Sequence, residues 1–326
     1  MYYPSGKKNI VVTGGAGFLG SWLCESLLQE GNNVICVDNL ISGNKNNIKH
    51  LLENKRFRFA EFDVIKPLPE KEISAFGKLD RIYHLASPAS PNINSKKSYM
   101  NYPVETMLVN SSGTYHLLEI ARKHKAKLLY ASSSEVYGEP EIHPQTEDYF
   151  GNVNSFGPRS CYDEAKRFGE AMVFSYIRKY AVSASVVRIF NTYGPRMDPE
   201  DGRVISNFIT QALKNEPLIV YGNGKQTRSF CFVSDLVKGL IMVMNSEKTN
   251  GEVLNLGNDV EYSIMDVIKI IEKVLGRKLS VSHGDLPIDD PTRRKPSLHK
   301  AYSLVGYKSE VDLEEGIRKT IAYFAK

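Results

Sequence analysis

Residues 13–20 read TGGAGFLG and directly follow a β-branched run from Asn9 to Thr13. In such a stretch the first glycine permits a tight turn, the second lets the backbone approach a pyrophosphate, and the third lets the next helix pack against the strand. Exposed N–H groups at the start of that helix then bind the anion. The order of strand, glycine-rich turn and helix therefore predicts a dinucleotide-binding unit.

Further strand-like segments follow the first one, separated by longer stretches in which apolar residues have helical spacing. Alternation of this kind indicates βαβ units, and the right-handed crossovers between parallel strands place helices on both faces of the sheet. We expect an α/β fold with a doubly wound, Rossmann-type parallel sheet. The predicted strands after the first span 33–38, 57–61, 79–85 and 127–132, and the predicted helices span 17–30, 104–124, 161–180 and 234–245.

After Asn191 the predicted elements become shorter and are more often interrupted by proline and glycine, for example at positions 195, 202, 217, 222 and 224. Such residues mark turns and loops. We interpret residues 1–190 as the dinucleotide-binding domain and residues 191–326 as a smaller α/β lobe that binds substrate and is interleaved with the first.

Composition excludes several classes of protein. The 326 residues are 24% charged with a formal net charge of +5 at pH 7, which is ordinary for a globular chain. The basic residues are dispersed, which argues against a nucleic-acid surface. No apolar run approaches the ~18 residues that span a membrane, so neither an anchor nor a signal peptide is expected.

The four cysteines, Cys24, Cys36, Cys161 and Cys231, lie far apart with no CxxC or Cys/His pairing. This spacing argues against a metal site and against a disulfide framework. Free thiols of this kind persist in reducing compartments. We therefore expect a cytoplasmic protein that uses no metal.

Asp38 ends the second predicted strand, eighteen positions after Gly20. An acid at this place accepts hydrogen bonds from an adenosine ribose diol and repels a 2′-phosphate, so NAD is favoured over NADP. The alternative is an aspartate that only caps the next turn. Ligands of open α/β sheets bind at the carboxyl ends of strands, where this sequence has Asp63, Val64, Leu85, Ala86 and Ser87.

Tyr162 and Lys166 stand four residues apart in CYDEAK, so both project from one face of the predicted helix. An ammonium group beside the phenol lowers its pKa toward neutrality, which suits a group that removes a hydroxyl proton. Upstream, the strand YASSSEVYG ends in hydroxyls followed by Glu135. Ser133 is positioned to share a proton with a substrate oxygen and the Tyr162 phenol.

Together with other segments, these motifs resemble those of the extended short-chain dehydrogenase/reductase family of nucleotide-sugar enzymes. The strings that carry the resemblance are TGGAGFLG, the YxxxK pair, HLASPASP (84–91), RIFNTYGPR (188–196) and YGNGKQTRSF (221–230). Within that family SSSEVYG and the segments at 151–167, 200–208 and 289–297 are most similar to the UDP-glucuronate decarboxylase branch. The resemblance covers nearly the whole chain.

The resemblance implies a lyase of nucleotide-sugar metabolism that uses NAD as a resident cofactor. Tyr162 would deprotonate the 4-hydroxyl of UDP-glucuronate, the resulting 4-keto sugar would lose CO2, and hydride returned to C4 would give UDP-xylose. Ser133 matches the relay hydroxyl, Glu135 the carboxylate near C5, and Arg294 the guanidinium at the carboxyl end of the substrate. The two long apolar helices resemble the pair that forms the homodimer of the family.

The resemblance also extends the list of binding residues. Asn191, Arg203, Tyr221 and Arg228 match positions that contact the UDP portion. Read without the resemblance, Arg203 and Arg228 would be surface cations, Tyr221 a core residue and Arg294 a solvated one. The complete set of expected cofactor-binding residues is Gly14, Gly17, Phe18, Leu19, Asp38, Asn39, Ser42, Asp63, Val64, Leu85, Ala86, Ser87, Tyr162, Lys166 and Thr192.

Other activities on the same fold stay open. A 4,6-dehydratase typically has an aspartate where this chain has Ser134, and a 4-epimerase usually lacks a carboxylate at Glu135. The loop at 91–102 is longer than in the family, and Leu108 stands where decarboxylases commonly carry a lysine, which leaves dehydration or epimerisation of another nucleotide sugar as alternatives. A non-catalytic NAD-binding scaffold is the alternative of another class.

Overall fold

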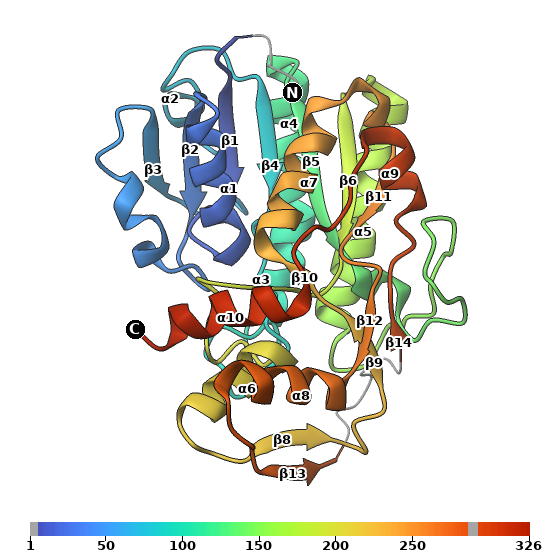
Figure 1. Ribbon diagram of the computed structural model, residues 1–326. Helices are drawn as coiled ribbons and strands as arrows, with labels where there is room; N and C mark the ends of the chain where they lie inside the picture. Colours follow the sequence, from blue (N-terminus) through green and yellow to red (C-terminus); the bar gives the residue numbers. More distant parts are fainter. Residues whose placement is uncertain (1–5, 286–292) are drawn as a thin grey trace.

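The computed structural model describes residues 6–285 and 293–326. A parallel sheet of seven strands in the order β11-β6-β5-β4-β1-β2-β3 forms its centre (Figure 1). The strand order reverses between β1 and β4, which creates the switch point where open α/β sheets bind ligands. The strands are β1 (Asn9–Thr13), β2 (Asn33–Asp38), β3 (Phe57–Glu61), β4 (Arg81–His84), β5 (Lys127–Ser133), β6 (Ala184–Ile189) and β11 (Val253–Leu256).

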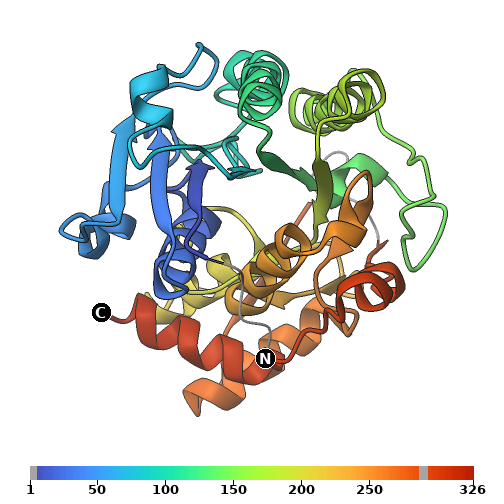
Figure 2. The same ribbon diagram turned by 90° about the horizontal axis from the view of Figure 1, so that it is seen from above.

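Helices cover both faces of this sheet, as Figure 2 shows from above. Buried apolar side chains of α4 and α5 pack on one face, and those of α1 and α7 pack on the other. The doubly wound α/β arrangement predicted from the sequence is therefore confirmed. These helices are α1 (Phe18–Gln29), α4 (Thr114–His124), α5 (Ser160–Tyr180) and α7 (Val233–Asn245); the short helices α2 (Glu70–Ile73) and α3 (Pro103–Leu108) lie in the connections.

The remaining elements form a smaller group at the bottom of Figure 1 and along one side of the sheet. Parallel β8–β13 and the small sheet β12-β9-β14 belong to it, and β7 pairs with β10. The helices are α6 (Val204–Leu213), α8 (Ile264–Leu275), α9 (His299–Val305) and α10 (Leu313–Phe324). The strands are β7 (Thr192–Tyr193), β8 (Leu218–Tyr221), β9 (Thr227–Ser229), β10 (Cys231–Phe232), β12 (Glu261–Ser263), β13 (Val281–Gly284) and β14 (Arg293–Arg294).

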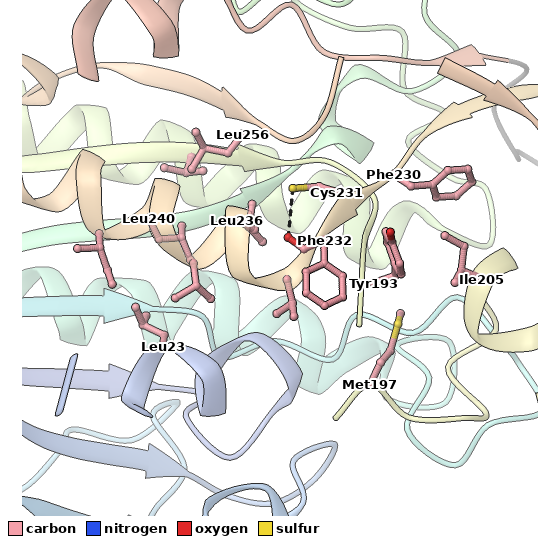
Figure 3. Packing of buried hydrophobic residues seen from close by; sticks show 14 of the residues in the cluster. Leu23, Tyr193, Met197, Ile205, Phe230, Cys231, Phe232, Leu236, Leu240 and Leu256 are labelled. Atoms are coloured by element: carbon pink, nitrogen blue, oxygen red, sulfur yellow. Dashed lines mark hydrogen bonds between the residues drawn. The ribbon is translucent and has the colours of Figure 1, made fainter. Parts of the chain in front are cut away.

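One hydrophobic core links this smaller group to the main sheet. Figure 3 shows Leu23 of α1, Leu240 of α7 and Leu256 of β11 in the same cluster as Ile205 of α6. Segments beyond residue 190 thus enter both the sheet and the smaller group. The division into two domains at residue 190 stays a prediction.

The predicted strand boundaries differ from the observed ones only at 79–85, where β4 is shorter, and at 127–132, where β5 extends by one residue. The helix predicted over 104–124 is instead two α-helices joined by a π-helical turn at Val109–Gly113. Within this turn the Asn110 side chain donates to the Thr106 carbonyl oxygen and to Ser87 Oγ (2.9 and 3.0 Å). These bonds tie the turn to the carboxyl end of β4, and apolar spacing carries no information about them.

Candidate active site

A cavity of about 1350 Å³ lies where the strands of the sheet end and the smaller group begins. Every site residue predicted from the sequence lines it, from Gly14 in the first turn to Arg294 in β14. Residues 289–292 of the segment 289–297 lie outside the described part of the chain. The fold therefore brings together side chains that are more than 250 positions apart in the sequence.

The glycine-rich turn forms one end of the cavity, and its backbone leaves no space for side chains. Gly14 has a φ of +70°, and a Cβ there would lie 2.8 Å from the backbone of Ala86. A Cβ at Gly20 would lie 2.1 Å from the Gly14 carbonyl oxygen. Helix α1 begins at Phe18, and its N-terminus has no side-chain cap in the described chain, so its first N–H groups are available to an anion.

Asp38 is fixed beside this turn at the end of β2. Its Oδ2 accepts the Ala16 N–H at 2.9 Å and its Oδ1 accepts the Leu40 N–H at 2.8 Å. Burial raises the pKa of Asp38, and these backbone hydrogen bonds oppose the rise. The tight cradle and the buried carboxylate beside it fit the pyrophosphate and ribose of a dinucleotide.

Tyr162, Lys166 and Ser133 meet where α5 packs on the end of β5. Lys166 Nζ donates to the Ala131 carbonyl oxygen at 2.8 Å and lies 5.6 Å from the centre of the Tyr162 ring. Ser133 hydrogen-bonds the Tyr162 hydroxyl. The helical spacing thus places the phenol, the ammonium group and the relay hydroxyl together, as the sequence indicated.

The electrostatics of the pair differ from the sequence-based expectation. Burial raises the pKa of Tyr162 to about 12, while the Arg203 charge and the Ser133 hydrogen bond act in the opposite direction. Burial also lowers the pKa of Lys166 to about 7, against the attraction of Glu170. The prediction that the lysine brings the phenol pKa toward neutrality is wrong for the protein chain by itself, because desolvation outweighs the attractive charges.

Glu135 occupies the other end of the cavity between two guanidinium groups. Arg159 Nη2 lies 2.7 Å from Glu135 Oε2, and Arg294 Nη2 lies 3.5 Å from the same atom. Although burial alone would raise the pKa of Glu135, the charges of Arg294 and Arg159 hold it at about 2. Glu135 is therefore ionised at neutral pH.

Arg294 is only 1% exposed, so it is not the solvated residue that its loop suggested. It donates to the carbonyl oxygens of Ser134 and Gly138, the latter at 3.0 Å. Its Nε is buried and has no partner among the described residues. A buried guanidinium with an unused donor at a cavity wall is suited to an anionic group of a ligand.

The other predicted substrate-binding residues lie on neighbouring elements. Arg203, before α6, forms two hydrogen bonds with the Asp201 carboxylate (2.8 and 2.9 Å) and one with the Ala89 carbonyl oxygen (2.7 Å). Arg228 on β9 is buried and stands in register with Arg294 on β14. Tyr221 ends β8 and is 41% exposed, so the alternative that it is a core residue is wrong. Asn191 precedes β7.

Two residues that sequence reasoning missed stand among these groups. Arg159 precedes Tyr162 by three positions, close to one helical turn, and that spacing could have revealed it. Tyr99 stacks on Tyr162 with ring centres 4.9 Å apart, and its buried hydroxyl has no partner among the described residues. Tyr99 comes from the long loop at 91–102, which lines the cavity, and no local pattern marks it.

Leu108 is 38% exposed on α3 and does not line the cavity. The leucine at this position therefore does not change the side chains that form the cavity wall. Within 6–285 and 293–326, no three His, Cys, Asp or Glu side chains gather in a way that could hold a metal ion. No helix in the same ranges is long and apolar enough to cross a membrane. The cavity thus has a glycine-lined end and an arginine-lined end.

Comparisons with known proteins agree with this geometry. Residues 10–257 match the model of the NAD dependent epimerase/dehydratase family. UDP-glucuronic acid decarboxylase 1 of Xenopus tropicalis is 48% identical over 98% of this chain and 73% of its own length. UDP-glucuronic acid decarboxylase 4 of Arabidopsis thaliana is 46% identical over 96% of this chain and 69% of its own length.

Among solved structures, the UDP-glucuronic acid 4-epimerase of Bacillus cereus, crystallised with UDP-glucuronic acid and NAD, superposes with a TM-score of 0.85. It is 29% identical, and the match covers 97% of this chain and 98% of that one. The sequence is thus much more similar to the decarboxylases, whereas the fold is shared with an epimerase.

Proposed function

The chain belongs to the NAD dependent epimerase/dehydratase family, and on that premise we propose that it decarboxylates UDP-glucuronate to UDP-xylose and CO2. The observation that carries the choice of reaction is the buried Arg294 beside Glu135, in the same cavity as Tyr162 and Lys166. A cationic wall next to an acid/base pair suits a substrate whose carboxyl carbon lies two bonds from the carbon to be oxidised.

The cofactor we assign is NAD, held at the glycine-lined end by the α1 N-terminus and by Asp38. Bound NAD supplies the oxidation of C4 to a ketone and its later reduction. The phenolate form of Tyr162 takes the proton of the C4 hydroxyl and returns it, with Ser133 sharing the same proton. The charge of Arg203 favours that form, and bound NAD would add the positive charge of its nicotinamide ring. Lys166 holds its place through the Ala131 carbonyl oxygen and contributes a positive charge beside the phenol when it is protonated.

The loss of CO2 follows from the position of the ketone. A carboxylate β to a carbonyl loses CO2 as its electrons move into an enolate, and a proton added at C5 gives the 4-keto pentose. Return of the hydride to C4 would then give UDP-xylose. Glu135 is ionised at neutral pH, so we assign to it the orientation of a water or sugar hydroxyl near C5 and not the donation of the proton itself. Arg294 binds the carboxylate of the substrate until CO2 is lost, and Arg203 and Arg228 bind the diphosphate.

The 4-epimerase and 4,6-dehydratase alternatives are less consistent with the residues present. Ser134 is not an acid, so it cannot protonate a departing 6-hydroxyl as a dehydratase requires. An epimerase must let the keto sugar rotate, whereas Arg294 and Glu135 favour a sugar fixed by its carboxylate. A non-catalytic scaffold has no need of Tyr162, Lys166, Ser133 and Glu135 in one cavity.

The direct test is incubation with UDP-glucuronate, first without and then with added NAD, followed by NMR of the products. UDP-xylose with an equivalent of CO2 is expected, and Tyr162→Phe is expected to abolish it while NAD stays bound. A stable C4 epimer would identify an epimerase. No conversion by the parent, or unchanged turnover by Tyr162→Phe, would refute the catalytic assignment.

We further propose that the chain forms a homodimer in the cytoplasm. The outer faces of α3, α4 and α5 expose large apolar side chains, namely Val104, Met107, Tyr115 and Phe168, at 46–61% of their surface. Light scattering after gel filtration should give twice the chain mass, and Phe168→Glu should give a monomer. The four cysteines are free, which is consistent with a reducing compartment.

A further inference from the structure

Gln145 does not line the cavity, yet it binds the segment that bears Arg294. It hydrogen-bonds both backbone polar groups of Lys295, the residue that follows Arg294. Its backbone N–H donates to the Lys295 carbonyl oxygen at 2.9 Å, and its Oε1 accepts the Lys295 N–H at 2.8 Å. Its carbonyl oxygen also accepts the Ser297 N–H at 2.8 Å. Gln145 is fully buried, and its Nε2 donates to the Ile142 carbonyl oxygen at 2.8 Å, so each polar group of this residue is engaged.

This anchor matters because the register of β14 decides which arginine faces the cavity. Arg293 is exposed, whereas Arg294 is buried against Ser134 and Glu135. A slip of one residue in an extended segment turns every side chain to the opposite face. Among the residues that the structure describes, the pairing of β14 with β9 involves Arg293 and Arg294 alone, and these two pairs offer little to fix the register by themselves.

A largely buried chain of hydrogen bonds runs from Gln145 to Glu170 on α5, the helix that also carries the acid/base pair. Asn255 Nδ2 donates to the Gln145 carbonyl oxygen at 3.1 Å, and the Tyr137 hydroxyl donates to Asn255 Oδ1 at 2.8 Å. Arg188 Nη1 donates to the Tyr137 hydroxyl at 3.0 Å and also forms a bidentate pair with Glu170 (2.9 and 2.8 Å).

The chain ends where the catalytic groups are attached. Glu170 Oε1 accepts the Ser132 hydroxyl at 2.6 Å, so α5 holds β5 at the residue next to Ser133. Glu170 follows Tyr162 and Lys166 at the same four-residue spacing on α5. One polar network therefore joins the segment after Arg294 to the helix that carries Tyr162 and Lys166, and such networks restrict movement.

We propose that Gln145 is a positioning residue that fixes the register of β14 and thereby sets Arg294 to bind the carboxylate of the substrate. The inference rests on the proposed function, since that function assigns the carboxylate to Arg294. Gln145 does not line the cavity, so we expect its effect on binding to pass through Arg294. A merely structural role predicts an equal loss for every ligand, whereas positioning predicts a loss confined to ligands with a carboxylate.

The experiment measures how strongly the protein prefers UDP-glucuronate to UDP-glucose, which lacks the carboxylate. NAD-loaded Tyr162→Phe protein, which is expected not to turn either sugar over, is the parent for calorimetry. Gln145→Met removes the amide at nearly constant volume. Asn32→Leu is the matched control. The buried Asn32 amide, just before β2, also accepts a backbone N–H (Lys8, 3.2 Å) and donates to a carbonyl oxygen (Leu27, 3.1 Å).

We expect Gln145→Met to reduce the preference for UDP-glucuronate about tenfold, the size of one lost charged hydrogen bond, and to leave the affinity for UDP-glucose within about twofold. Asn32→Leu should leave the preference unchanged. Arg294→Gln should reduce the preference by at least as much, and adding Gln145→Met to Arg294→Gln should have no further effect, because residues that act through one contact are not additive. Full additivity, or an equal loss for both sugars, would overturn the inference.

Two additions separate the possible failures. Gln145→Glu is the milder variant in case Gln145→Met does not fold, because a buried, protonated Glu keeps both the acceptor and a donor, and it should retain the preference. If the parent binds both sugars equally, the proposed function has failed. Hydrogen exchange of residues 293–297 then decides the positioning claim: it should rise in Gln145→Met and not in Asn32→Leu, and equal protection would refute it.

Discussion

The two ends of the cavity solve the problem of binding an anion in opposite ways. At the cofactor end, defined by Gly14, Gly20 and Asp38, the main chain approaches the ligand because side chains are missing. The substrate end, defined by Glu135 and the arginines at 159, 203, 228 and 294, is crowded with side-chain charge. The cofactor end should therefore be sensitive to added volume, and the substrate end to altered charge.

Adding one methyl group at the cofactor end should have the largest effect. In Gly20→Ala the new Cβ meets backbone atoms of Gly14 and Gly15 at 2.1 and 2.6 Å, and backbone cannot yield as a flexible side chain does. We expect loss of bound NAD and a fall in activity of at least ~1000-fold, of the order that removal of an essential catalytic group causes. Release of the nucleotide by denaturation, with absorbance at 260 nm, measures the NAD content.

Gly113→Ala is the control for this substitution, because a Cβ at Gly113 meets its nearest neighbours at 3.4 and 3.5 Å within a helical segment. It should retain NAD and activity. A Gly20→Ala protein with a full complement of NAD would show that the turn tolerates volume, and the contrast between the two ends would fail.

A change of charge at the cofactor end should have a smaller effect. Asp38→Asn keeps the size of the side chain, but its nitrogen cannot accept a backbone N–H as the carboxylate oxygen does for Ala16 or Leu40. We expect the affinity for NAD to fall about tenfold, the value of a charged hydrogen bond. The preference for NAD over NADP should also narrow, because the charge that repels a 2′-phosphate is gone. Fluorescence titration of the apoprotein with both nucleotides checks this, and an unchanged ratio would contradict it.

The same contrast explains how much could be predicted from the sequence. The turn at 13–20 and Asp38 lie within one strand–helix–strand unit, so spacing alone places them in three dimensions. The strands β1, β2 and β3 were also predicted to the residue. Tyr162, Lys166 and Glu135 follow from helical spacing and from the end of β5.

The substrate end was harder to predict because tertiary contacts build it. Arg294 reaches Glu135 across 159 positions, and only the resemblance to a family linked the two before the fold was known. Arg159 was overlooked although its three-residue spacing from Tyr162 was visible. Tyr99 lies in a loop whose course depends on contacts with the segment 198–201, such as the Lys97–Asp198 ion pair, and the pKa of Tyr162 depends on burial, which no local pattern reports.

Removing the Glu135 carboxylate from the substrate end should lower the stability of the folded protein by an amount that depends on pH. The pKa of Glu135 is about 2 in the folded protein, against an ordinary value of 4.5, so its contribution to stability is complete above about pH 4.5 and is lost as the pH falls toward 2. Glu135→Gln should therefore be less stable than the parent by on the order of 2 kcal/mol at pH 6, with the difference shrinking on acidification. Urea unfolding at a series of pH values measures it.

Glu53→Gln, at an exposed site away from the cavity, controls for the loss of any carboxylate. A constant difference between Glu135→Gln and the parent from pH 6 to pH 3 would show that Glu135 is not held ionised by Arg159 and Arg294. In that event the assignment of Glu135 as an acceptor near C5 would also have to be abandoned.

The smallest expected effect is a difference between the two ends in how strongly ionic strength weakens ligand binding. The substrate brings a diphosphate and a carboxylate toward guanidinium groups, whereas the cofactor end offers main-chain N–H groups at short range. Because the screening length falls from about 10 Å at 0.1 M salt to about 3 Å at 1 M, only the longer-range attraction is lost. We expect KM for UDP-glucuronate to rise about threefold over this interval, with the NAD content unchanged. A neutral osmolyte at matched osmolality should leave KM constant. Equal salt sensitivity of NAD retention and of KM would mean that the main-chain cradle and the arginine cluster attract anions over the same range, and the distinction between geometry at one end and charge at the other would not hold.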